Sequence, residues 1–302
     1  MKISGLSLFY FLLLAQIGFA QEINNTFAKK RVLIGAPIRQ KPAILKEFLL
    51  SLEQLYSNNF QMHFIFVDDN NVPESVQMLS EFALKHAGNC IIASTDKIED
   101  NYICNEQTHY WNDSIIWKVA FFKDSIIEYA LSHDFDYLFL IDSDLVLYPE
   151  TIEHLITLNK DIVSEIFWTS WQPDTCKLPQ VWYYDEYKQY IINPGEQLSD
   201  YDIATRQQEF LQRMETPGTY EIGGLGACTL LSKKALAKGA RFKKIKNLTF
   251  WGEDRHFCIR AAALDLEMFV DTFYPAYHIY RESYLDGVNT FKENCKKGIY
   301  QI

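Results

Sequence analysis

Two aspartates, Asp142 and Asp144, directly follow an apolar run (138–141) in the stretch LFLIDSDLVLYP. In an extended chain, residues two positions apart face the same side, so the two carboxylates would repel each other. Mg²⁺ and Mn²⁺ prefer oxygen ligands and often share one or two carboxylates with the phosphates of a substrate. The pattern therefore favours a metal site, with Ser143 between its ligands, over a strand-end turn with solvated acids.

A second acidic pair, Glu253 and Asp254, follows Gly252 in FWGEDRHF at the predicted start of a helix over 252–264. Acids are stabilised at a helix N-terminus by the dipole and by free N–H groups, so the pair could serve only to begin the helix. The functional hypothesis is a general base that the same dipole keeps ionised. The sequence leaves both interpretations open.

Two further motifs carry weaker signals. His278 lies among aromatic residues in YPAYHIYRE, where an ordinary core histidine is the simpler interpretation. Gly223 and Gly224 open the segment GGLG, which could be a turn or bulge, or a place where the backbone approaches a substrate closely.

Composition limits the possible function classes. The chain has 302 residues, of which 48% are hydrophobic, enough for one large core or two small ones. A net charge of −10 argues against a general nucleic-acid binder. Residues 233–246 contain seven lysines or arginines, for which a solvated helix and loop is favoured over a docking face for an anionic acceptor or membrane.

The N-terminal segment 1–20 is typical of a targeting signal. Lys2 precedes an apolar run, and Gly18 and Ala20 are the small residues expected before a cleavage point. The run is short for a transmembrane helix, so a cleaved signal is expected, with an uncleaved membrane anchor as the alternative. Residues 21–302 are then one domain. Four of the six cysteines could form a disulfide or two, whereas Cys228 and Cys258 fit a core.

The elements that must position these residues alternate between strand and helix. Apolar runs predict strands over 31–36, 63–67, 90–94 and 136–142, and helical periodicity predicts helices over 42–56, 73–88 and 114–132. This order predicts an α/β, Rossmann-like, mostly parallel sheet with helices on both faces, whose ligands bind at the carboxyl ends of the strands. The less regular second half, including a strand over 161–168, predicts an acceptor-side insertion.

Taken in order, the motifs resemble those of the GT-A fold glycosyltransferases, and most of all the family 2 type of nucleotide-sugar transferases. The resemblance covers about residues 31–282 and rests on APIR, VDDN, LIDSD, GGLG, WGED and YH. It implies that Mn²⁺ or Mg²⁺ is held against the donor diphosphate by Asp142, Asp144 and His278. It also implies that Asp254, with Glu253 beside it, is the base of an inverting reaction.

The same resemblance implies a donor site for a UDP- or GDP-sugar. Its residues would be Pro37, Arg39, one of Asp68 and Asp69, Lys118, Ser143, Gly223 and Gly224. The acceptor would be a glycan, a protein or a lipid-linked molecule. Neither the Q/R-x-x-R-W motif nor the several membrane spans of processive synthases is present, which favours transfer of single sugars.

Two other hypotheses remain. A haloacid dehalogenase-like phosphatase would use Asp142 as its nucleophile, but its motif normally opens the domain and needs a later Gly-Asp-x-x-x-Asp segment. A non-catalytic GT-A domain would bind a sugar nucleotide or glycan and would lose the base. Because nucleotide sugars occur in the cytosol and in the ER and Golgi lumen, we expect a lumenal enzyme, or a membrane-anchored one that faces the cytosol. The aromatic stretch 168–190 is either an acceptor platform or core packing.

Overall fold

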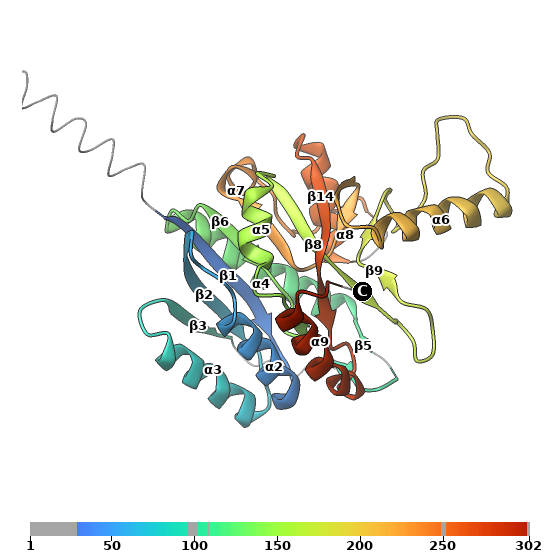
Figure 1. Ribbon diagram of the computed structural model, residues 1–302. Helices are drawn as coiled ribbons and strands as arrows, with labels where there is room; N and C mark the ends of the chain where they lie inside the picture. Colours follow the sequence, from blue (N-terminus) through green and yellow to red (C-terminus); the bar gives the residue numbers. More distant parts are fainter. Residues whose placement is uncertain (1–28, 96–101, 108, 249–251, 301–302) are drawn as a thin grey trace, which may run out of the picture.

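One mixed sheet forms the centre of the protein (Figure 1). The structure, a computed structural model, describes residues 29–95, 102–107, 109–248 and 252–300, so the predicted N-terminal signal or anchor lies outside the described residues. The strands run across the sheet in the order β11 (Thr219–Ile222), β14 (Met268–His278), β8 (Ile162–Thr169), β13 (Thr229–Ser232), β6 (Tyr137–Leu140), β1 (Lys30–Ile38), β2 (Phe60–Asp68) and β3 (Cys90–Ser94).

The predicted parallel sheet is confirmed in the first half of the chain. Strands β6, β1, β2 and β3 are parallel neighbours. Their connections contain α2 (Pro42–Glu53), α3 (Pro73–Lys85) and α4 (Asp113–Ser132). Proline opens α2 and α3, and the Asn112 side chain caps α4 by accepting a hydrogen bond from the Ile115 N–H at 3.0 Å.

Alternation along β1 explains why helices cover both faces of this sheet. Val32 and Ile34 belong to a buried cluster with residues of α2 and α3, including Phe48. Leu33 points the other way, into a cluster with Ile126 and other residues of α4. Successive side chains of a strand face opposite sides, so one apolar run supplies both layers.

The second half of the sheet is mixed. β13 is antiparallel to both β6 and β8, β14 is parallel to β8, and β11 is antiparallel to β14. Around it lie β4 (Ile103–Cys104), β5 (His109–Tyr110), β7 (Leu145–Val146), α5 (Thr151–Thr157), β9 (Leu178–Pro179), β10 (Val181–Trp182), α6 (Asp200–Met214), β12 (Gly224–Leu225), α7 (Lys233–Lys238), α8 (Glu253–Ala263), a 3-10 turn (Glu282–Tyr284) and α9 (Leu285–Lys297).

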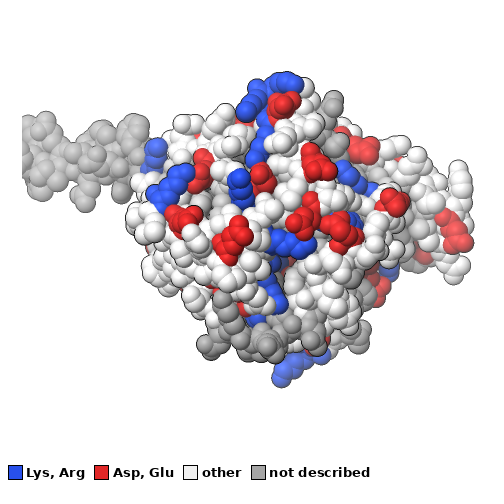
Figure 2. Space-filling model, turned by 90° about the horizontal axis from the view of Figure 1, so that it is seen from below, with Lys and Arg blue, Asp and Glu red and all other residues white. Residues whose placement is uncertain are grey.

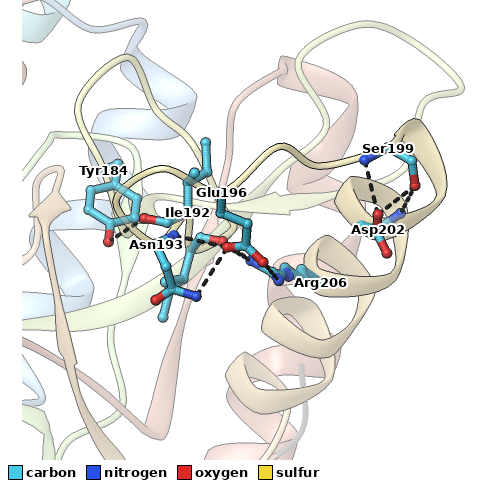
Figure 3. A network of polar contacts seen from close by, with 8 residues as sticks. Tyr184, Ile192, Asn193, Glu196, Ser199, Asp202 and Arg206 are labelled. Atoms are coloured by element: carbon cyan, nitrogen blue, oxygen red, sulfur yellow. Dashed lines mark hydrogen bonds and ion pairs between the residues drawn. The ribbon is translucent and has the colours of Figure 1, made fainter.

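Helix α6 and the loop before it are the most prominent part of this insertion, projecting from one side of the sheet (Figure 1). Ser199 caps the helix and exchanges hydrogen bonds with Asp202 in a capping box. Arg206 of α6 reaches back to Glu196, with nitrogen–oxygen distances of 2.5 and 3.0 Å (Figure 3). These contacts fix the loop to the helix, although both lie at the surface.

Several sequence expectations can be compared with this fold. All six cysteines are free thiols, so none of the disulfides that the sequence allows is formed. Four residues of the basic run 233–246 form ion pairs with neighbouring acids, as the solvated interpretation predicts: Lys233–Asp134, Lys234–Asp161, Arg241–Glu128 and Lys244–Asp113. Figure 2 shows basic and acidic side chains interspersed on the face seen from below. Among the described residues, no helix is both long and apolar enough to cross a bilayer.

Candidate functional site

A cavity of about 350 Å³ opens at the carboxyl ends of the strands, where the sequence predicts a ligand site. It brings together ten of the thirteen predicted site residues: Pro37, Arg39, Asp69, Lys118, Asp142, Ser143, Asp144, Glu253, Asp254 and His278. These residues span more than two hundred positions of the sequence. Only the fold brings them together.

The other three predicted residues do not line this cavity. Asp68 is buried, and its Oδ1 accepts hydrogen bonds from the backbone N–H and side-chain amide of Asn70 at 3.0 and 2.7 Å. Asp69, rather than Asp68, is therefore the acid that faces the cavity after β2.

Gly223 and Gly224 meet a packing need instead. A Cβ on Gly224 would lie 2.0 Å from the ring of Trp182, and one on Gly223 would lie 1.8 Å from the carbonyl oxygen of Tyr183. Both positions need glycine so that β12 can pack against β10. Farther along the same segment, Ala227 lines the cavity.

Two of the three predicted metal ligands, Asp144 and His278, contact each other. His278 Nε2 lies 3.5 Å from Asp144 Oδ2, and the other ring nitrogen of His278 is 2.9 Å from the hydroxyl of Thr169. Burial favours the neutral form of Asp144, but His278 outweighs this effect, so the pKa of Asp144 is lowered. Burial raises the pKa of Asp142 to about 6, against the opposing effect of Lys123.

One oxygen atom of Asp144 bears on whether the site can bind a divalent cation. Asp144 Oδ1 is buried and has no hydrogen-bond partner in the part of the chain that the structure describes, although buried polar atoms normally have one. Among the described residues, no three His, Cys, Asp or Glu side chains are arranged to hold an ion by themselves. Mg²⁺ and Mn²⁺ sites commonly take their remaining ligands from substrate phosphates and water, so the oxygen-rich pair fits such an open site.

On the side of the cavity next to β2, one carboxylate is bound by two cations. Lys118 Nζ lies 2.7 Å from Asp69 Oδ2, Arg39 lies 3.8 Å from the same oxygen, and the Thr95 hydroxyl is 3.0 Å from Oδ1. The Arg39 guanidinium also lies 5.4 Å from the centroid of the Tyr102 ring. This wall can bind an anionic or planar group.

On the other side, a buried lysine that sequence reasoning missed joins the acidic pair. Lys123 Nζ of α4 lies 3.0 Å from Glu253 Oε1 and 3.0 Å from Asp254 Oδ1. Burial alone would lower the pKa of Lys123, but Asp254, Glu253 and Asp142 raise it well above its usual value. Burial raises the pKa of Asp254 to about 7, although Lys123 opposes this shift.

A sequence signal for Lys123 did exist. Positions 116, 120, 123, 127 and 130 form the buried stripe of α4, and Lys123 is its only charged member. A lysine on such a stripe needs a buried acid. Glu253 and Asp254 lie in the first turn of α8 and also bind Lys123, so they do more than begin the helix. The general base stays a prediction.

Aromatic side chains complete the cavity. The aromatic stretch 168–190 divides between cavity and core: Trp171 and Tyr187 line the cavity, whereas Trp182 packs in the core. The role as an acceptor platform stays a prediction. The loop that carries Tyr187 is held by Arg255 of α8, which forms a two-pronged ion pair with Asp185 at 2.5 and 2.7 Å.

The comparisons with known proteins are consistent with this geometry. The family model described as glycosyltransferase family 25, N-terminal domain, matches residues 29–214, more than half of the chain. A search of curated protein sequences found no significant match. The matched region ends at the last residue of α6, so Asp254 and His278 lie beyond it.

Two solved structures share the fold. GalNAc-T7 with UDP, GalNAc and Mn²⁺ has a TM-score of 0.54 at 11% identity, over 83% of this chain and 43% of that one. The mannosyltransferase PcManGT from Pyrobaculum calidifontis, in complex with GDP-Man and Mn²⁺, has a TM-score of 0.51 at 8% identity, over 89% of this chain and 62% of that one. The chain thus spans less than two thirds of either protein.

These findings confirm the GT-A fold and the predicted likeness to glycosyltransferases, and they favour it over the haloacid dehalogenase-like hypothesis. The chain belongs to the family described as glycosyltransferase family 25, N-terminal domain.

Proposed function

We propose that the chain is a metal-dependent glycosyltransferase that moves a single sugar from a nucleotide-sugar donor to an acceptor hydroxyl. The observation that carries this proposal is the buried Oδ1 of Asp144, which has no hydrogen-bond partner among the described residues and lies in the wall of the cavity that also holds Asp254. A charged oxygen in that state is costly unless a ligand approaches it. A cation that arrives with a UDP- or GDP-sugar would meet this need.

Asp142, Asp144 and His278 are the residues that would hold the cation. When bound, Mn²⁺ or Mg²⁺ neutralises the charge that develops on the leaving diphosphate. Lys118 and Arg39, which already converge on Asp69, are placed to bind the nucleoside end of the donor. Both solved structures above contain Mn²⁺, so it is the first metal to test.

Asp254 is the proposed general base. Lys123 binds its Oδ1, and Asp254 itself lines the cavity. A pKa of about 7 suits a carboxylate that accepts a proton from an acceptor hydroxyl near neutral pH. If that hydroxyl attacks the anomeric carbon opposite the leaving diphosphate, the configuration inverts.

Calorimetric titration of the chain with UDP and with GDP, in Mn²⁺ and then in EDTA, tests the donor site. We expect binding of one nucleotide that needs Mn²⁺ and that Asp144→Ala abolishes. Asp134→Ala, which changes an acid with 80% of its side chain exposed, is the matched control and should bind as the unaltered chain does. If neither nucleotide binds to the folded protein in Mn²⁺, the proposal is wrong.

A non-catalytic binding domain is the second candidate, and Asp254 distinguishes the two. Asp254→Asn should preserve nucleotide binding in both cases. In a transferase it should also abolish the release of nucleotide from a sugar-nucleotide donor. A binding domain would show no such release before or after the substitution.

A further inference from the structure

The cavity extends to both sides of the paired aspartates. Asp142 follows β6, and Asp69 follows β2, two strands away in the sheet. Trp171 follows β8, two strands away in the opposite direction. With neighbouring strands about 4.8 Å apart, each side reaches about 10 Å from Asp142. If the nucleoside lies on the Asp69 side, the side at Trp171 is left for the acceptor.

Trp171 presents a large aromatic surface on that side. Its side chain lines the cavity and 47% of the residue is exposed. Among the described residues, its only ring contact is with Tyr280, at 5.6 Å between centroids and 77° between planes. Tyr280 itself is stacked with His109 at 4.0 Å. Since the contact with Tyr280 is nearly perpendicular, no ring among these residues lies flat against the indole.

A single buried side chain holds Trp171 in place. The Arg281 guanidinium donates hydrogen bonds to the carbonyl oxygens of Trp171 at 3.0 Å, Ser170 at 2.6 Å and Glu106 at 2.8 Å. Only 4% of Arg281 is exposed, and its guanidinium lies 4.9 Å from the centroid of the Tyr280 ring. One cation thus fixes the backbone at the tryptophan, the β4–β5 hairpin and the neighbouring ring.

A polar group lines the same cavity as Trp171. Gln180 lines the same cavity, and its amide donates to Thr169 at 2.9 Å, which fixes the orientation of the side chain. A cavity with both a rigid aromatic face and a fixed amide suits a sugar ring, which offers a C–H face on one side and hydroxyl groups at its edge. A lipid chain would require a wholly apolar wall instead.

We propose that Trp171 is the stacking ring of an acceptor-sugar subsite that Arg281 positions, so that the acceptor is a saccharide. This inference rests on the proposed function, because it assigns the nucleoside to the opposite side of the cavity. Among glycans, proteins and lipid-linked molecules, it selects an acceptor whose reacting hydroxyl is carried by a sugar. Arg281 acts through the backbone of Trp171 and is a positioning residue.

Saturation-transfer NMR on the full chain, with Mn²⁺ and saturating UDP or GDP, tests this subsite. The probes are methyl β-galactoside, methyl α-mannoside and methyl N-acetyl-β-glucosaminide, with N-acetylserine amide as the non-sugar hydroxyl. We expect at least one glycoside to bind, with transfer strongest at the C–H protons of one ring face. Trp171→Ala should weaken this binding about tenfold, the loss typical of one stacking contact. Trp171→Phe, which keeps a ring, should weaken it less.

Two further variants separate positioning from general stability. Arg281→Ala should weaken glycoside binding while the nucleotide binds as before, and Arg281→Lys should not restore it, because an ammonium cannot match the guanidinium fork. Tyr201→Ala removes an aromatic residue on α6 that is 79% exposed and lies outside the cavity lining. As the matched control, it should leave glycoside binding unchanged.

Three results would overturn the subsite: no glycoside binds while the nucleotide does, glycoside binding survives Trp171→Ala, or N-acetylserine amide binds in its place. Failure of the nucleotide to bind would instead refute the proposed function. Failure of the subsite and failure of the proposed function are distinguishable, because nucleotide binding and glycoside binding are measured on the same sample.

Discussion

Removal of Lys123 tests the buried charge cluster most directly. Its ammonium lies 3.0 Å from both Glu253 and Asp254, and only 5% of its side chain is exposed. Removing one partner of a buried ion pair typically costs about 3–5 kcal/mol, because it leaves an uncompensated charge. Most domains have a total stability of about 5–15 kcal/mol. Lys123→Met should therefore fold but unfold far more readily.

The expected size of the effect can be stated for two assays. In chemical denaturation followed by circular dichroism, the free energy of unfolding should fall by about 3–5 kcal/mol. At about 2–4 °C per kcal/mol, the melting temperature should fall by roughly 6–20 °C. Since Lys123 opposes the raised pKa of Asp254, its loss should raise that pKa further and move any base-dependent activity to higher pH.

Lys233→Met is the matched control, because Lys233 pairs with the exposed Asp134 at the surface. Such pairs contribute at most about 1 kcal/mol. A triple variant with Lys123→Met, Glu253→Gln and Asp254→Asn should regain part of the lost stability, since the two carboxylates that contact Lys123 are then neutral as well. If Lys123→Met is no less stable than Lys233→Met, the cluster does not stabilise the fold as argued.

Three further predictions follow from the contacts described. The pKa of Asp254 in the folded state, about 7, exceeds that of an unfolded aspartate. This group therefore stabilises the fold below pH 4, and the contribution is lost as the pH rises through 7. Asp254→Asn should remove this part of the pH dependence of the free energy of unfolding. Arg255→Gln breaks the two-pronged pair with Asp185 and should cost about 1–3 kcal/mol in thermal unfolding, with no change in monomer mass by light scattering. Hydrogen bonds with Arg206 lower the pKa of Glu196 to about 2. In Arg206→Ala, this pKa should rise toward that of free glutamate, which NMR titration of Glu196 measures. An unchanged pKa would contradict the contact.

The first half of the fold could be predicted from sequence because its information is local. Apolar runs alternate with helical periodicity, and a proline or Asn112 marks the start of each helix. The carboxyl ends of parallel strands must meet at one edge, so Asp69 and Asp142 could be placed near each other without any contact information. The same reasoning could not decide whether Asp68 or Asp69 faces the cavity. That choice depends on which of the two side chains forms hydrogen bonds with Asn70.

The missed elements depend on distant contacts. β14 is not among the strands predicted above, and it contains Pro275, a residue that is rare in strand interiors. The structure accommodates the proline where the register between β14 and β8 shifts, between Asp271 and Ala276. Lys123 was overlooked because its partners lie about 130 positions away, and the position of Arg281 in the fold was likewise invisible in the sequence around it.

Helix α4 carries Lys118 at Asp69 and Lys123 at Asp254, and the helical rise sets their separation along the axis at about 7.5 Å. The length of this helical segment thus sets the distance between the two ends of the cavity. Removal of one residue between the two lysines would turn one by about 100° relative to the other and separate it from its acid. The spacing within α4 is therefore fixed by two contacts at once, one at each end of the cavity.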